Sequence, residues 1–356
     1  MGQVIRIQLG AQYYVFMDKN KLIHLITILA ILVVLAVISR STNLINMFNI
    51  FQKTDFQQTS LGLDFLSKSE FDNFFALVKN DLVNRGMVIG EIKDGLLIAK
   101  VNGEDVNFGL VNLAQNYKLV NEAEWTALIK NHFDTLVKSR SDDADIWNNV
   151  SDFVKVKDFL AVQLYPDDYF NSVGEIKNEV ITRSVMPSVI STLVFDLPTS
   201  IQTVVLSNVK VWNKTEDELF SLALANTFRK ITPRIFEQQL GGVKVTVIGS
   251  DNYLTAVLVL NLNKYNQCIG NNGSLVAIPT RDVIMCYPIN DLGVVKAISG
   301  FAPLVSKLNA EGPGSLSSKL YWYKDNKFTN LPYNFDEGKL NFIPPQSFVD
   351  MLKALK

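Results

Sequence analysis

The chain has 356 residues, and its 34 lysines and arginines nearly balance its 35 aspartates and glutamates. Hydrophobic residues make up 48% of the sequence and charged residues 19%, a composition typical of a chain that folds around a core. The formal net charge of -1 provides no basic excess for a phosphate backbone, so we expect no nucleic-acid partner.

An apolar stretch without a charged side chain occupies residues 22–38. At about 1.5 Å per residue it covers about 26 Å, close to the lower limit for crossing the hydrocarbon core of a bilayer. We therefore expect a single-pass transmembrane anchor. A cleavable signal peptide is the alternative, although the stretch lacks an A-x-A site and is longer than a typical apolar signal region.

Basic residues on the two sides of this stretch predict its orientation. Arg6, Lys19 and Lys21 precede it, whereas Arg40 and Lys53 follow it. Because basic residues accumulate on the cytoplasmic side, we expect a cytoplasmic N-terminus and an extracytoplasmic C-terminal domain.

The pattern of the chain predicts one folded domain attached to this anchor. Starts of translation at Met1 and at Met17 both fit the sequence, since either leaves a short basic segment before the anchor. The expected order is a short N-terminal segment (1–21), the anchor (22–39), a stalk or linker (40–68), an α+β domain (69–332) and a C-terminal tail with a short helix (333–356).

The first part of the domain predicts a helix, a hairpin and a second helix. Apolar residues recur at helical spacing up to Leu82, and Asn102-Gly103 is a strong hairpin signal between two apolar runs. The expected elements are a helix that Ser69 caps and Arg85-Gly86 ends, strands at 96–101 and 106–110, and a helix with the capping pair Asn121 and Glu124.

The second part predicts antiparallel hairpins with intervening helices. The clearest signal is the capping box of Thr215 and Glu218, which starts a helix with acidic residues in its first turn. The expected elements are strands or short helices at 154–164 and 180–185 with a break at Pro187, strands at 201–206, 209–212, 243–248, 253–260, 274–279, 283–286 and 319–323, a helix from Asn290 that Gly300 and Pro303 break, a turn at Asp325-Asn326 and a tail helix from Ser347.

Three short motifs of this second part recur in the same order in a known family. They are residues 212–219 (WNKTEDEL), 222–226 (LALAN) and 276–283 (VAIPTRDV). With this order the chain resembles the YtpQ-like family of uncharacterised bacterial proteins, whose domain has no assigned function. The resemblance covers residues 70–332 and implies a single α+β domain. It implies no activity and gives no residue a catalytic role.

The most reactive candidate site is the turn Thr280-Arg281-Asp282 between two apolar strands. Such a turn can present an arginine fork beside a carboxylate, as anion-binding and acid/base sites require. The alternative is a purely structural turn, in which Asp282 caps the backbone and Arg281 pairs with it. Trp212, the first residue of the family-like motifs, is a further candidate binding residue.

Cysteine and histidine are scarce. The only cysteines, Cys268 and Cys286, would permit a disulfide outside the cytoplasm, and two buried free thiols are the alternative. The only histidines, His24 and His132, are too few for a histidine-based zinc or triad site. We expect no metal, no cofactor and no catalytic set.

These observations favour a membrane-anchored, non-catalytic interaction or scaffold module with a protein partner. The alternative is a membrane-bound hydrolase or transferase that uses the turn from Thr280 to Asp282.

Overall fold

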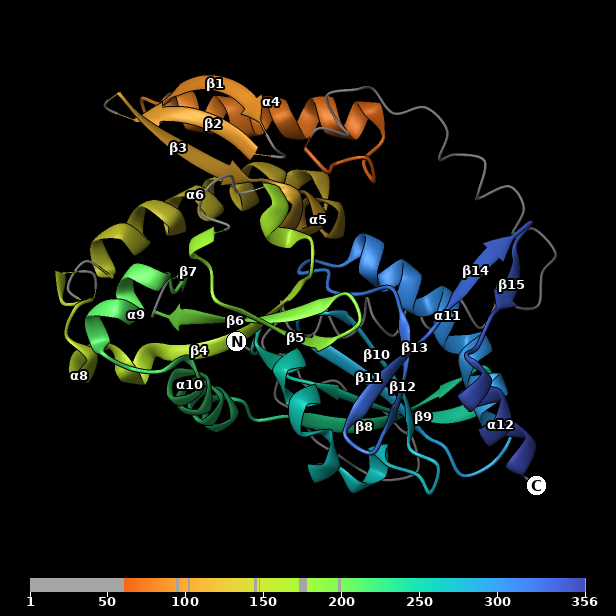
Figure 1. The fold of residues 1–356 in the computed structure, drawn as a ribbon. Coiled ribbons are helices and arrows are strands. Elements are labelled where there is room, and N and C mark those ends of the chain that lie inside the picture. The colour runs from red at the N-terminus through yellow and green to blue at the C-terminus, as the bar shows by residue number, and fades with distance from the viewer. Residues whose placement is uncertain are drawn as a thin grey trace, which may run out of the picture. The chain divides into compact units, whose positions relative to one another are not determined.

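We describe the protein from a computed structural model, which covers residues 61–93, 96–101, 103–143, 146, 148–172, 178–197 and 200–355. The expected N-terminal segment and anchor lie outside these residues. Within them, no helix is both long and apolar enough to cross a membrane. The strands of the described sheets pair in antiparallel fashion, and helices pack on them, which confirms the α+β class (Figure 1).

The N-terminal part of the described chain builds its own hydrophobic core. Phe74, Val78, Leu97 and Phe133 are buried in it. Its elements are α4 (Lys68–Asn84), β1 (Val88–Lys93), β2 (Leu96–Val101), β3 (Glu104–Gly109), α5 (Val111–Leu119) and α6 (Trp125–Asp142), with the three strands in the order β1-β2-β3. The predicted hairpin is confirmed, whereas β1 and α5 were not predicted.

The cap of α4 is Ser67 and not Ser69, so this prediction is wrong by two residues. Ser67 Oγ accepts a hydrogen bond from Glu70 N at 3.3 Å, and Glu70 Oε2 accepts one from Ser67 N at 2.6 Å. Only Ser67 has a glutamate three positions later, which completes the reciprocal box. Leu61 and Leu63 are buried in the same core, so the folded part begins before residue 69.

The larger core lies between two further sheets. β6 is paired with β4 on one side and with β5 and β7 on the other, and the second sheet has the order β13-β12-β10-β11-β9-β8. The elements are β4 (Leu160–Pro166), β5 (Thr182–Met186), β6 (Val189–Asp196), β7 (Ile201–Thr203), α9 (Leu206–Trp212), α10 (Glu216–Lys230), β8 (Arg234–Leu240), β9 (Val243–Gly249), η6 (Thr255–Lys264), η7 (Asn266–Cys268), β10 (Ser274–Thr280), β11 (Val283–Pro288), α11 (Gly293–Glu311), β12 (Leu320–Lys324), β13 (Lys327–Leu331), β14 (Tyr333–Asp336), β15 (Lys339–Phe342) and α12 (Gln346–Ala354).

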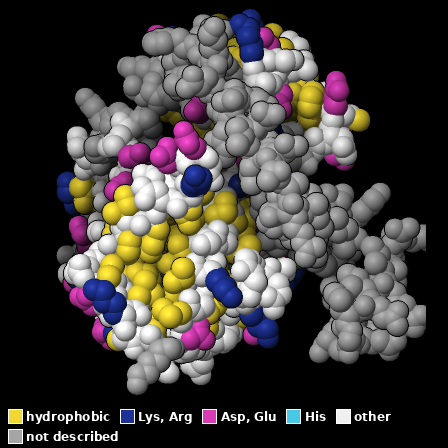
Figure 2. Space-filling model, turned by 90° about the vertical axis from the view of Figure 1, so that its right-hand side faces the viewer, with side chains coloured by type: hydrophobic (Ala, Val, Ile, Leu, Met, Phe, Trp, Pro, Cys, Tyr) yellow, Lys and Arg dark blue, Asp and Glu magenta, His cyan; other side chains and the backbone are white. Residues whose placement is uncertain are grey.

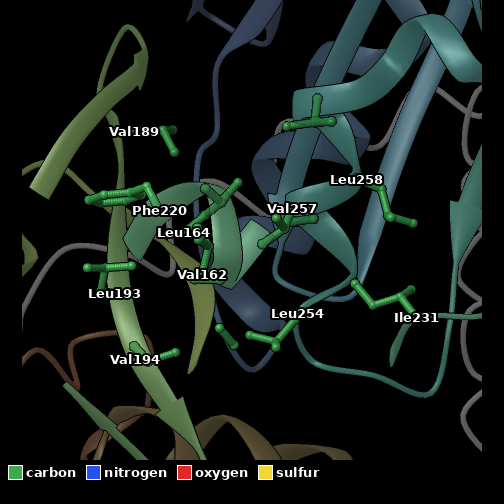
Figure 3. Close-up of a cluster of buried hydrophobic side chains, with 14 of the residues drawn as sticks. Val162, Leu164, Val189, Leu193, Val194, Phe220, Ile231, Leu254, Val257 and Leu258 are labelled. Atoms are coloured by element: carbon green, nitrogen blue, oxygen red, sulfur yellow. The ribbon is translucent and has the colours of Figure 1, made fainter. Parts of the chain in front are cut away.

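Side chains from sheet, helix and 3-10 helix meet in this core. Figure 3 shows Val162 and Leu193 of the smaller sheet together with Phe220 of α10 and Val257 of η6. The tail helix α12 is also buried against the larger sheet, because the rings of Phe348 and Trp322 meet edge to face at 5.3 Å. The folded body therefore extends past residue 332.

Several predicted elements are wrong because burial overrides the local pattern. Residues 209–212 belong to helix α9, and residues 253–260 enter the 3-10 helix η6. A continuous apolar run has no period that separates a strand from a buried helix. Helix α11 also continues through Gly300 and Pro303. Its packing against the sheet stabilises it, and a Cβ at Gly300 would lie only 2.9 Å from Leu240 Cγ.

Helix α10 seals the outer edge of β4 with two side chains. Asn226 Nδ2 donates hydrogen bonds to the carbonyls of Lys157 and Leu160, both at 2.9 Å. Thr227 Oγ1 accepts a bond from Val162 N at 2.9 Å and donates to Ala223 O at 2.8 Å. An open strand edge can pair with another chain, and here polar side chains replace the missing strand.

Removal of this seal should destabilise the fold. We expect Asn226→Ala to lower the free energy of unfolding by about 1–3 kcal/mol, because the carbonyl of Leu160 at the start of β4 loses its donor and that of Lys157 just before the strand loses one of its two. Urea unfolding of the full chain measures the change. Ser221→Ala, on the exposed side of α10, is the matched control and should change stability by less than about 0.5 kcal/mol. Equal unfolding midpoints for the two variants would contradict the assigned role.

Candidate functional site

A groove of about 490 Å³ opens on the body between the two sheets. Its volume is within the range of about 300–1,000 Å³ that is common for binding sites. The floor and walls come from β4–β6, α10, η6 and the β12–β13 hairpin, which chain order separates widely (Figure 1). The apolar lining residues are Val162, Val185, Phe220, Leu224, Val259, Leu260 and Phe328, and the polar ones are Arg183, Ser184, Ser191, Asn261, Asn263, Tyr323 and Asn326.

Arg183 provides the positive charge at one wall of the groove. Its guanidinium lies 4.0 Å from the centre of the Phe220 ring and donates a hydrogen bond to Asp217 Oδ1 at 2.5 Å. Because the Asp217 side chain is 91% exposed, this ion pair contributes little to stability and can exchange for another anion.

Amide groups also line the groove. Asn326 Oδ1 accepts hydrogen bonds from Asn263 Nδ2 at 2.5 Å and from the Tyr323 hydroxyl at 3.0 Å. Asn261 interrupts η6 with a non-helical backbone, and its side-chain amide makes no hydrogen bond within the described part of the chain. Amides of this kind can donate to and accept from a polypeptide backbone.

Two strand edges border the groove. β5 pairs only with β6 and β13 only with β12, so each keeps one edge without a partner strand among the described sheets. On β13, two residues after Phe328, Asn330 keeps a buried Oδ1 without a hydrogen-bond partner. A free strand edge offers the backbone groups that an added strand would pair with.

Arg281, at the β10–β11 turn, is held rigidly on an aromatic platform. Its guanidinium carbon lies 4.7 Å from the Tyr165 ring centre and 5.7 Å from that of Tyr169. Its backbone N donates to Gly314 O at 3.0 Å, and its carbonyl accepts from Ala256 N at 2.9 Å. Burial raises the pKa of Tyr165 above its ordinary value, so this ring stays neutral beneath the guanidinium.

The expected pairing of Arg281 with Asp282 does not occur. Asp282 is exposed, and its Oδ1 accepts a hydrogen bond from Thr280 Oγ1 at 2.5 Å. The turn therefore holds its carboxylate with a hydroxyl, as an Asp in a turn often does.

Trp212 lies in the core, although its motif suggested a binding role. It is 6% exposed, its Nε1 donates to Val150 O at 2.7 Å, and its ring meets Phe195 edge to face at 5.9 Å. Its role in the structure is to hold α9 against the smaller sheet.

Cys268 and Cys286 are free thiols, and both are fully buried. Burial raises the pKa of the Cys286 thiol, and the neighbouring Cys268 raises it further. Among the residues that the structure describes, no three His, Cys, Asp or Glu side chains gather as metal ligands.

Sequence reasoning missed the groove because its residues come from six segments, which span residues 162–328. Arg183 lies in a run for which the sequence pattern left strand and short helix open. The available signal was the pair Asn261 and Asn263, two amides that interrupt an otherwise apolar segment.

An exposed hydrophobic patch lies on the side of the molecule that is to the right in Figure 1. Figure 2 shows it bordered by charged side chains. Exposed hydrophobic residues of the segments on that side include Leu292, Val295 and Ile343. Patches of this kind mark contact surfaces for proteins or membranes.

Comparison with protein-family models, curated proteins and solved structures finds no match to this chain.

The two cysteines should resist thiol reagents in the native state. At about pH 8 a raised pKa leaves little thiolate at Cys286, and burial blocks access to both sulfurs. We expect slow labelling of the folded full chain and rapid labelling of two thiols after denaturation without reductant. Mass spectrometry reads the number of labels. Absence of labelling in the denatured chain, with full labelling after reduction, would show a disulfide instead.

Proposed function

We propose that this protein is a membrane-anchored interaction module whose body binds a partner polypeptide in extended form. The observation that supports the proposal is the groove between β5 and β13, where two unpaired strand edges adjoin an apolar floor. A peptide that adds to such an edge gains backbone hydrogen bonds, and pockets for alternate side chains select its sequence.

Basic residues around the groove favour an acidic partner. Lys264, Lys324 and Lys327 adjoin lining residues in the chain, and none of them forms an ion pair with the described residues. Asp217 pairs with Arg183 at the surface and is a weak competitor for a peptide carboxylate. We expect bound peptides to alternate apolar residues with acidic ones.

Peptide selection on the immobilised full chain tests the proposal. We expect a displayed random library to yield extended acidic peptides, and Asn261→Trp, which fills the groove, to weaken their binding by about tenfold or more. Asn266→Trp, on the exposed surface of η7, should bind like the wild type. Hydrogen exchange at residues 182–186 should slow when a peptide binds. Peptides that bind both variants equally would contradict the groove as the site.

We propose further that residues 22–39 anchor the protein, with the N-terminus in the cytoplasm and the body outside. The unbroken apolar stretch and the basic residues before it support this placement. We expect the native protein to stay in the membrane fraction after carbonate extraction, and a C-terminal tag to be cleaved by protease added to intact cells. Release into the supernatant would contradict the anchor, and protection of the tag would reverse the orientation.

Membership in the YtpQ-like family is also a proposal, supported by the residues of the three motifs. In this chain Thr215 and Glu218 form the capping box of α10, and Asn226 seals the β4 edge. Starting α10 and covering the β4 edge are structural roles, so proteins that share this fold would need such residues at these positions. An activity at the turn from Thr280 to Asp282 has less support, because Asp282 is exposed and bonded within its own turn.

A further inference from the structure

Arg281 carries a positive charge that the fold holds in place and does not neutralise. No carboxylate or carbonyl of the described chain accepts a hydrogen bond from its guanidinium, and its Nε is buried without a partner. A buried donor without a partner is costly, because it loses its hydration and gains no hydrogen bond in return. Such a group requires an explanation.

The surroundings of Arg281 keep its side chain ordered. Its stem packs beside Gly314, where an added Cβ would lie 3.5 Å from the Cβ, Cγ and Cδ of Arg281. Gly314 is itself fixed, because its N donates to Asn112 Oδ1 of α5 at 3.0 Å. The rings of Tyr165 and Tyr169 lie against the guanidinium. The Arg281 side chain therefore loses little further conformational entropy when it binds a ligand.

The terminal nitrogens of the guanidinium are the groups that remain available to a ligand. Nε is the only atom of this side chain that is both buried and unpartnered, so the two terminal nitrogens reach solvent. They form a planar fork that matches the two oxygens of a carboxylate.

We propose that Arg281 binds a monocarboxylate group end-on, with the Tyr165 and Tyr169 rings beside it. Two acids flank the site in sequence, Asp282 next to Arg281 and Asp168 next to Tyr169. Their negative charge disfavours a dianion, so a singly charged carboxylate fits better than a phosphate. The site is separate from the groove, since Arg281 does not line it. The inference therefore stands independently of the proposed peptide site.

Calorimetric titration of the full chain with acetate, benzoate and inorganic phosphate tests this site. We expect wild type to bind the two carboxylates in the millimolar range and more tightly than phosphate. Arg281→Gln should weaken carboxylate binding by about tenfold or more, because two charge-assisted bonds are lost. Arg281→Lys should bind with intermediate affinity, since an ammonium cannot form the fork. Arg234→Gln, at an exposed arginine of β8, is the control and should bind like wild type.

A second pair of variants tests the aromatic platform without removing the charge. Tyr169 is 43% exposed, so Tyr169→Leu and Tyr169→Phe should both fold. We expect the leucine variant to lose affinity and the phenylalanine variant to keep it, because the ring and not the hydroxyl positions Arg281. Unchanged carboxylate binding in folded Arg281→Gln, or tighter binding of phosphate than of acetate by wild type, would overturn the proposal.

Discussion

The hydrogen bonds from α10 to the edge of β4 decide which edge of the smaller sheet is open to another strand. Asn226 and Thr227 satisfy two backbone groups of β4 that a neighbouring strand would otherwise bind, Leu160 O and Val162 N. The same helix places Phe220 and Leu224 along the face of the sheet. Helix α10 thus covers the β4 edge of this sheet. The β5 strand at the other side pairs only with β6, and it lies beside the apolar groove that Phe220 and Leu224 line.

The groove and the Arg281 site share one physical property. Each has polar side-chain groups that make no hydrogen bond within the described chain. Asn261 and Asn330 keep amide groups without partners in the described chain, and Arg281 keeps a buried Nε. Folded proteins satisfy most buried polar groups, because an unpaired one loses its hydration without compensation. A ligand can bind where such side chains also keep donors that reach solvent, as the two terminal nitrogens of Arg281 do.

Signals that act within a few residues predicted the elements well. The capping box at Thr215 and the glycine turn at Gly103 both depend on hydrogen bonds and backbone angles between near neighbours. The turn at Asp325-Asn326 is a similar case, with both residues at positive φ. The errors lie in apolar segments without a period, such as η6, where the choice between strand and helix depends on what packs against them.

Local chemistry in the sequence determined the α+β class, the start of α10 and the hairpin turn at Gly103, because these depend on contacts between residues a few positions apart. Tertiary structure alone decided which candidates form sites. It buried Trp212 in the core, separated Arg281 from a pairing with Asp282 and placed it over Tyr165. It also assembled the groove from six segments. No spacing in the sequence encodes those neighbours, since they meet only when the sheets and α10 close around a common core.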